Sequence, residues 1–183
     1  MKPFLKPLAA VVSALLLAIA CAEKPKHTAV RLPDGETVML VGTASLDSLS
    51  NPPFDAWFRP NYEAAQPAPE KINALKPLLE GVQIRVFAAT WCKDSRLLVP
   101  RLIKVLEQAG YPRQEVEVIV LSREKTTPLH EEEGYDIINV PTLIFYRDGE
   151  ELNRIVEYAI EDLESDMLKI LSGEPYQNPY DWD

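Results

Sequence analysis

Between residues 82 and 121 the sequence changes from a largely apolar run to an amphipathic stretch and back again. The runs 82–89 and 116–121 have the length and composition of strands that are buried on both faces. Residues 94–109 have the periodicity of a helix, which Gly110 closes. Parallel strands joined by a helix form a right-handed β-α-β unit. The sequence therefore predicts an α/β fold.

The turn between the first strand and the helix carries the run Thr90-Trp91-Cys92-Lys93-Asp94-Ser95. A cysteine at such a turn faces unpaired backbone N–H groups and the positive end of the helix dipole, which both favour thiolate over thiol. We therefore predict that Cys92 is a reactive nucleophile; the alternative is a packed, inert cysteine. Ser95 stands where the second cysteine of a C-x-x-C redox pair would stand. We expect its hydroxyl to cap the helix, to hydrogen-bond the sulfur, or to do both.

Residues 1–20 have the pattern of a signal peptide. Lys2 and Lys6 form a positive start, and an apolar run follows from Leu8 to Ile19. Spanning a bilayer needs roughly 20 apolar residues, so this run is too short for an ordinary transmembrane helix. We therefore expect the segment to direct the chain out of the cytoplasm.

The end of this segment, Leu17-Ala18-Ile19-Ala20-Cys21, resembles the bacterial lipobox, in which the cysteine carries the lipid. The same residues also satisfy the A-x-A site of ordinary signal peptidase. We expect lipidation of Cys21, which would anchor the protein on the periplasmic side of the bacterial cell envelope. Ala22 is not the aspartate linked with inner-membrane retention, so the outer membrane is the expected location.

Charge and ligand content argue against several classes of function. The formal net charge is −9 and there is no basic stripe, so we expect no nucleic-acid partner. Two histidines, His27 and His130, and two cysteines leave no metal-ligand set at a recognisable spacing, and we expect neither metal nor cofactor. If Cys21 is acylated, Cys92 is the only free thiol of the mature protein, and no intramolecular disulfide can form.

The residues before the β-α-β unit predict an extension of the domain. Residues 21–50 begin as a polar tether and continue as two alternating runs around Pro33-Asp34-Gly35, a β-hairpin signal. Residues 51–81 form a flap and a short helix: we interpret residues 51–69, which carry aromatic residues among prolines, as an irregular flap over the core rather than a ligand platform. A short amphipathic helix over 70–79 closes this segment.

The residues after the unit complete the domain. In chain order we expect a polar loop (122–127), a weak helical turn (128–135), two strands (142–146 and 151–158), a helix (160–171) and a surface tail (173–183). The run Arg147-Asp148-Gly149-Glu150 predicts a hairpin between the two strands. Four apolar residues form the inward face of the helix: Leu163, Met167, Ile170 and Leu171.

The segment 82–172 resembles the thioredoxin-like fold family in this order of elements. Three local features carry the resemblance: Trp91-Cys92 at the strand-to-helix turn, Pro100 in the helix, and Val140-Pro141-Thr142, which looks like the family's cis-proline loop. The W-C-x-D-S site is also similar to a group of bacterial thioredoxin-like lipoproteins. The resemblance implies a three-layer α/β/α sandwich with a mixed central sheet, here with an N-terminal extension. It further implies that Trp91, Val140, Pro141 and Thr142 bind an extended peptide beside the sulfur.

Two residues depart from the family's pattern. Ser95 replaces the resolving cysteine that releases product, and Val86 stands where thioredoxins carry a buried carboxylate. Turnover by two thiols of one chain is therefore chemically ruled out. The first hypothesis is a monothiol thiol–disulfide oxidoreductase that acts on protein or low-molecular-weight thiols and disulfides, with an external thiol as resolver. The alternatives are a non-catalytic peptide- or protein-binding module and a membrane-tethered scaffold.

Overall fold

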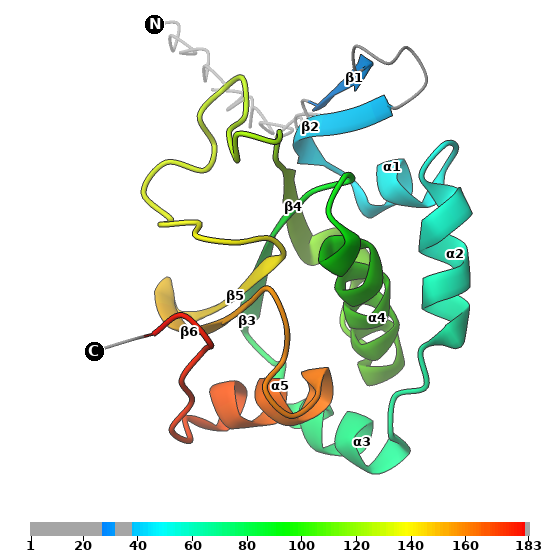
Figure 1. Ribbon diagram of the computed structural model, residues 1–183. Coiled ribbons are helices and arrows are strands. Elements are labelled where there is room, and N and C mark those ends of the chain that lie inside the picture. Colours follow the sequence, from blue (N-terminus) through cyan, green and yellow to red (C-terminus); the bar gives the residue numbers. More distant parts are fainter. Residues whose placement is uncertain (1–26, 32–37, 182–183) are drawn as a thin grey trace, which may run out of the picture.

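The structure is a computed structural model that describes residues 27–31 and 38–181. A six-stranded sheet with the strand order β1-β2-β4-β3-β5-β6 forms its centre. The helices gather on one side of this sheet, and a long irregular segment lies on the other side (Figure 1). The predicted signal peptide and Cys21 lie outside the described residues. Within the described ranges, no helix has the length and apolar character needed to cross a bilayer.

The predicted β-α-β unit is confirmed. Strand β3 (Val82–Ala88) and strand β4 (Val116–Val120) pair in parallel, with α4 (Lys93–Ala109) and a short 3₁₀ turn, η1 (Arg113–Glu115), between them. Gly110 ends α4 at a φ of 82°, a left-handed conformation that glycine adopts without strain. The cysteine turn therefore lies at the carboxyl end of a central strand.

The predicted C-terminal hairpin is also confirmed. Strand β5 (Thr142–Arg147) pairs antiparallel with β3 on one side and with β6 (Glu150–Val156) on the other. Asp148 and Gly149 in the connecting turn both have positive φ, which is the backbone requirement of a type I′ hairpin turn. The sheet is consequently mixed.

The N-terminal extension is part of this sheet. Strand β1 (His27–Arg31) pairs antiparallel with β2 (Val38–Ala44), as the two alternating runs predict, while the turn at 32–37 lies outside the described residues. Strand β2 also pairs antiparallel with β4. The hairpin therefore adds two strands to the central sheet.

The irregular flap predicted over residues 51–69 is wrong, because most of this segment is helical. Helix α1 (Leu46–Ser50) leads to α2 (Asp55–Ala64), and α3 (Pro69–Leu78) follows as predicted within a residue. The aromatic residues of α2 share one helical face at spacings of three or four residues, and this face outweighs the internal proline. They cover the core as expected: Phe54 and Phe58 are buried, and Trp57 and Tyr62 pack against them.

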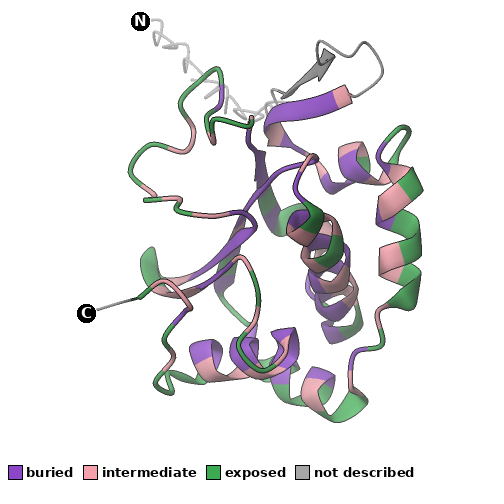
Figure 2. Ribbon diagram, viewed as in Figure 1, coloured by how far each residue is buried: buried purple, intermediate pink, exposed green. Residues whose placement is uncertain are grey.

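The large core lies between the helices and one face of the sheet. All five described α-helices contribute buried side chains to it, together with alternate residues of the strands (Figure 2). The opposite face holds a smaller cluster around Phe87 and Ile144, which Tyr135 and Ile137 of the long loop cover. The weak helical turn expected over 128–135 consists of successive hydrogen-bonded turns. The thioredoxin-like fold class with a mixed sheet is confirmed, and an irregular segment forms the layer on this second face.

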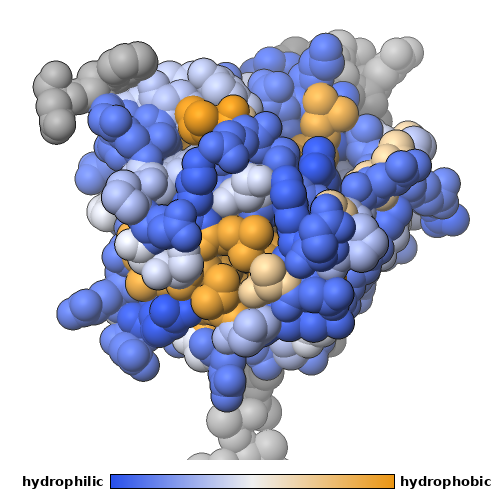
Figure 3. Space-filling view, turned by 90° about the horizontal axis from the view of Figure 1, so that it is seen from below, coloured by the Kyte–Doolittle hydropathy of each residue, from blue (hydrophilic) through white to orange (hydrophobic). Residues whose placement is uncertain are grey.

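The last helix, α5 (Leu163–Ser172), begins three residues later than the periodicity predicts. Asp162 is its N-cap, and the Asp162 carboxylate accepts a hydrogen bond from the Ser165 N–H, which stops the helix from extending backwards. The four residues predicted to face inward are all buried. Seen from below, the face that contains α3 and α5 is mostly hydrophilic around an apolar area (Figure 3).

The described part of the C-terminal tail lies against the domain. Tyr176 packs on the core, and its hydroxyl donates a hydrogen bond of 3.0 Å to the buried carboxylate of Asp166. The backbone carbonyl of Tyr176 accepts a hydrogen bond from the Asn153 side chain on β6. Burial of the Tyr176 ring, followed by the charge of Asp166, raises the pKa of the phenol above its ordinary value. The tail is thus bound to both α5 and the sheet.

Candidate functional site

Cys92 lies where the sequence predicts, at the junction of β3 and α4. It is the N-cap residue of α4, with an extended backbone conformation, and its N–H donates to the Ala89 carbonyl at 3.1 Å. Only 9% of its surface is exposed, and it takes part in no disulfide. A partner can therefore reach the sulfur only from the side on which the turn is open.

Two oxygen atoms lie near the sulfur of Cys92. Its S–H group donates to the Val140 carbonyl at 3.2 Å, and the Asp94 Oδ2 atom is 3.9 Å away. The Val140–Pro141 peptide bond is cis, which confirms the isomer that the family resemblance implies. The loop predicted to hold a peptide is thus in direct contact with the predicted nucleophile.

Ser95 does not cap the helix, because Cys92 occupies the N-cap position. The Ser95 side chain is 2% exposed and lies within the first turn of α4, and its Oγ atom accepts a hydrogen bond of 3.1 Å from the Ala89 N–H. Because a serine at this position points back to the end of β3, its hydroxyl satisfies a backbone donor that the sheet leaves free. Ser95 therefore holds the shape of the cysteine turn.

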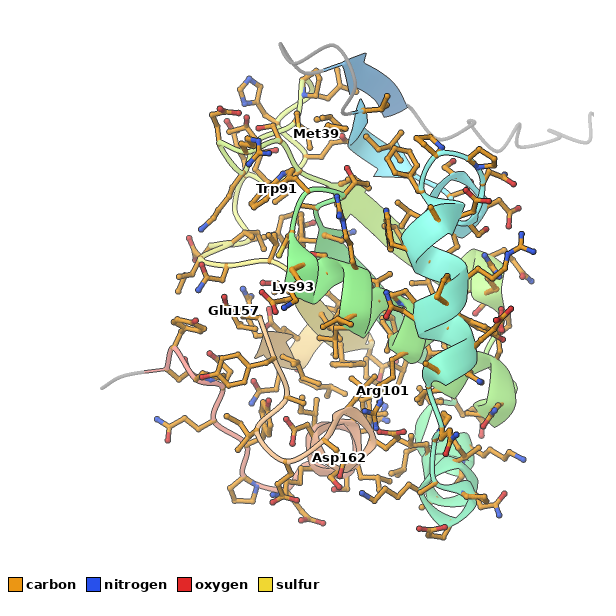
Figure 4. The ribbon with its side chains drawn as sticks, turned by 45° about the vertical axis from the view of Figure 1, so that its right-hand side comes forward. Met39, Trp91, Lys93, Arg101, Glu157 and Asp162 are labelled. Atoms are coloured by element: carbon orange, nitrogen blue, oxygen red, sulfur yellow. The ribbon has the colours of Figure 1, made fainter. Side chains whose placement is uncertain are left out.

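Trp91 has its indole anchored on the neighbouring strand end. Its Nε1–H donates to the Leu121 carbonyl at 3.1 Å, and the Arg123 guanidinium lies 5.6 Å from the centre of its ring. Trp91 lies above the start of α4, which Lys93 marks (Figure 4). The ring thus forms part of the surface next to Cys92.

The cysteine turn is also tied to elements that sequence reasoning did not connect with it. The Arg96 Nε–H donates to the Thr90 carbonyl at 2.6 Å, and the Arg96 guanidinium lies over the ring of Trp57 in α2. The Thr90 hydroxyl accepts a hydrogen bond of 3.2 Å from the Leu40 N–H on β2. The N-terminal extension therefore helps to position the turn.

Asn139 is a second residue that sequence reasoning missed. Its Oδ1 atom accepts a hydrogen bond of 3.2 Å from Lys125, and its Nδ2–H donates at 3.2 Å to Glu157. The Thr142 hydroxyl donates to the Asn139 carbonyl at 2.6 Å, so the predicted peptide-binding Thr142 uses its side chain within the loop. Glu157 also accepts from Tyr180 of the tail. Asn139 thereby connects both sides of the cis-proline loop.

Among the described residues, the two buried carboxylates, Glu164 and Asp166, belong to α5 and not to the cysteine turn. Val86 is fully buried among apolar side chains, so the position of the usual carboxylate is occupied by hydrocarbon. Glu164 is buried and pairs with Arg101 at 2.8 Å, and Asp166 accepts from the Ile160 N–H at 2.6 Å. These groups organise α5 and the loop before it. Within residues 27–31 and 38–181, no three potential ligand residues gather into a metal-binding group.

Comparisons with known proteins agree on the kind of domain. A sequence model of the family described as thioredoxin matches residues 56–166. The chain is 29% identical over 79 residues to a thioredoxin of Listeria monocytogenes, which covers 43% of this chain and 72% of that protein. It is 31% identical over 83 residues to the mitochondrial thioredoxin-2 of Schizosaccharomyces pombe, covering 45% of this chain and 58% of the relative.

A search of solved structures gives a more distant similarity. A protein of unknown function from Pseudomonas aeruginosa matches with a TM-score of 0.48 at 17% sequence identity. The match covers 64% of this chain and 81% of the other chain.

Proposed function

This chain belongs to the thioredoxin family, and we propose that it carries out thiol–disulfide exchange with Cys92 as the nucleophile. The observation that carries the proposal is the contact between the Cys92 sulfur and the Val140 carbonyl of the cis-proline loop, at 3.2 Å. An extended peptide that pairs with the backbone of this loop would bring its own sulfur next to Cys92. The binding surface and the nucleophile are therefore adjacent.

The reaction uses one protein thiol and one external thiol. The Cys92 thiolate attacks one sulfur of a partner disulfide, R–S–S–R′; a mixed disulfide with R forms, and R′–S⁻ leaves and takes up a proton. An external thiol, R″–SH, then loses its proton and attacks the R sulfur, which releases the Cys92 thiolate and R–S–S–R″. The net reaction exchanges R′ for R″, and the protein is neither oxidised nor reduced.

The reaction needs an external thiol because residue 95 is a serine and not a second cysteine. A hydroxyl cannot attack a mixed disulfide in the way that a second cysteine does, and this hydroxyl is already bound to the Ala89 N–H. Glutathione or a second protein thiol can supply the missing step. We expect the mixed disulfide to persist until such a thiol arrives.

The experiment incubates the protein with a glutathionylated peptide, with and without free glutathione. Without free glutathione we expect an adduct on Cys92 by intact mass, and with free glutathione we expect turnover. Cys92→Ala is the control for the nucleophile, and Ser95→Cys is expected to release the adduct without glutathione. Absence of any adduct on the wild-type protein rejects the proposal.

We further propose that a lipid on Cys21 tethers the protein to the periplasmic side of the bacterial cell envelope. The proposal rests on the lipobox-like sequence before Cys21 and on the expected signal peptide. Intact mass of the protein extracted from native membranes tests it, because acylation adds the mass of the lipid to a chain that begins at Cys21. A mature chain that carries no lipid, or Cys21→Ala protein that stays in the membrane fraction, contradicts the tether.

A binding module without catalysis is the second candidate function. The burial of Cys92 and the hydrogen bond from its S–H group to the Val140 carbonyl favour this function, because both restrict attack by the sulfur on a partner. In this case the cis-proline loop would still hold an extended partner by backbone hydrogen bonds. Partner binding that is unchanged by Cys92→Ala, together with no adduct on the wild-type protein, would support the module.

A further inference from the structure

We propose that a cavity beside Cys92 is a subsite for a lysine or arginine side chain that lies next to the partner's cysteine. The proposal rests on the proposed function, because it names the class of polypeptide with which Cys92 would exchange. The cavity has a volume of about 190 Å³ and lies between α4 and the loop that follows β6. Figure 4 shows the two sides of this region, with Lys93 and Arg101 on α4 and Glu157 opposite them.

The cavity lies close enough to the Cys92 sulfur to contact residues next to the cysteine of a bound partner. Asp94 lines the cavity, and its Oδ2 atom is 3.9 Å from the Cys92 sulfur. Glu157 lines the other side, and its N–H donates to the Pro141 carbonyl at 2.7 Å. Residues of an extended chain advance about 3.3 Å each. A side chain one or two residues from the partner's cysteine can therefore enter the cavity.

The walls of the cavity suit the hydrocarbon part of a basic side chain. Leu97 and Tyr158 both line it, and they are 49% and 52% exposed. Ala159 adds a small apolar surface between them. Lysine and arginine bury their stems on such surfaces and keep the charged end in a polar environment. Contact with these walls would shield the exposed leucine and tyrosine from water.

The charges of the lining suit the cationic end of the same side chain. Two residues with carboxylates, Asp94 and Glu157, border the cavity. The Glu157 carboxylate keeps its charge while it accepts hydrogen bonds from the uncharged Asn139 and Tyr180. Arg101 also borders it, but the buried carboxylate of Glu164 lies 2.8 Å from its guanidinium and balances its charge. The carboxylates of the lining are therefore left in excess. Acidic side chains would be repelled and basic ones attracted.

The test compares two peptides that each carry a cysteine in a disulfide with thionitrobenzoate. The peptides differ only in one residue beside the cysteine, which is lysine in one and glutamate in the other. Release of thionitrobenzoate gives the rate of adduct formation with the intact protein. At low salt we expect the lysine peptide to react about fivefold faster, and we expect the ratio to approach one at about 1 M salt, where the charges are screened.

Two variants connect this ratio with the cavity. Asp94→Asn is expected to lower it to about twofold, since one of the two carboxylates is removed; any change in nucleophilicity cancels in the ratio. Ala159→Leu fills the cavity and is expected to lower the ratio as well. Glu150→Gln, at the exposed start of β6, is the matched control and is expected to keep the wild-type ratio.

The outcomes separate the subsite from the exchange reaction. Equal rates for the two peptides, or a ratio that neither cavity variant changes, overturn the subsite and leave the exchange reaction standing. Faster reaction of the glutamate peptide also overturns it. If neither peptide forms an adduct, both the exchange reaction and the subsite are rejected.

Discussion

The groups around the Cys92 sulfur have opposite effects on a negative charge at this atom. The N-terminus of α4 favours a negative charge on it through the helix dipole. The Val140 carbonyl and the Asp94 carboxylate place oxygen atoms near the sulfur, and these atoms would repel such a charge. The position of the cysteine at the helix start could be predicted from the sequence, whereas both oxygen contacts could be recognised only in the folded chain. Chemical reactivity at this residue thus depends on the balance between a local and a long-range effect.

Asn139 is predicted to position the cis-proline loop for reaction. Asn139→Ala removes its hydrogen bonds with Lys125 and Glu157, and we expect the rate of adduct formation on Cys92 to fall about tenfold because Val140 is held less firmly. We also expect a loss of about 1–2 kcal/mol in the free energy of unfolding. Both quantities can be measured on the same preparation, by adduct kinetics and by urea unfolding.

The matched control for this variant is Asn153→Ala. Asn153 also makes side-chain hydrogen bonds, but it makes them to the tail and to its own strand. We expect a similar loss of stability and an unchanged rate at Cys92. Equal loss of rate in both variants would show that Asn139 acts only through general stability.

At the scale of single elements, hydrophobic periodicity predicted most helices and strands. The high proline content led to one wrong prediction, that of an irregular flap in place of a helix. Residues 55–64 form a helix in spite of Pro60, because their aromatic side chains pack together on the core. Pro77 and Pro100 also lie inside helices, whereas Pro69 occupies the first turn of α3, where proline is favourable. Counting prolines therefore underestimated the helical content, since the effect of each proline depends on its place in the element.

The N-cap of α5 is predicted to make stability depend on acid pH. Burial alone would raise the pKa of Asp162, but hydrogen bonds from Lys71 and Ser165 lower it from 3.8 to about 2. The charged carboxylate therefore stabilises the fold above about pH 4, and this contribution is lost as the pH falls towards about 2. Urea unfolding at several pH values should show a smaller loss over this range for Asp162→Asn than for the wild type.

An exposed aspartate provides the control for this measurement. Asp148 lies in the β5–β6 turn at positive φ, a conformation that asparagine also tolerates. Asp148→Asn is expected to keep the wild-type dependence on pH. If Asp162→Asn keeps it as well, the capping carboxylate is not its source.

At the scale of the whole molecule, the N-terminal hairpin belongs to the folded domain. Strand β2 pairs with β4, and Leu40 on this strand is buried in the main core. We predict that Leu40→Ala lowers the free energy of unfolding by about 2–4 kcal/mol, as for other buried leucines. Leu129→Ala is the control, because Leu129 is 59% exposed, and we expect a change within about 0.5 kcal/mol. A small effect of Leu40→Ala would mean that the extension docks only loosely.

The sequence by itself determined the order of elements and the place of the nucleophile. The β-α-β unit, the two hairpins and the closing helix follow from local periodicity and turn residues, which act over a few positions of the chain. Cys92 at the start of α4 could be recognised in the same way, whereas the cis-proline loop around Pro141 was expected from the family resemblance.

Only the tertiary structure decided what these residues contact. The Cys92 sulfur meets Val140 across 48 positions of sequence, and Thr90 meets Leu40 across 50. The Arg101–Glu164 pair that leaves an acidic cavity beside the cysteine spans two helices. Such contacts depend on how separate elements pack, and no local pattern encodes them. The environment of the single nucleophile is therefore a property of the fold, while its presence is a property of the sequence.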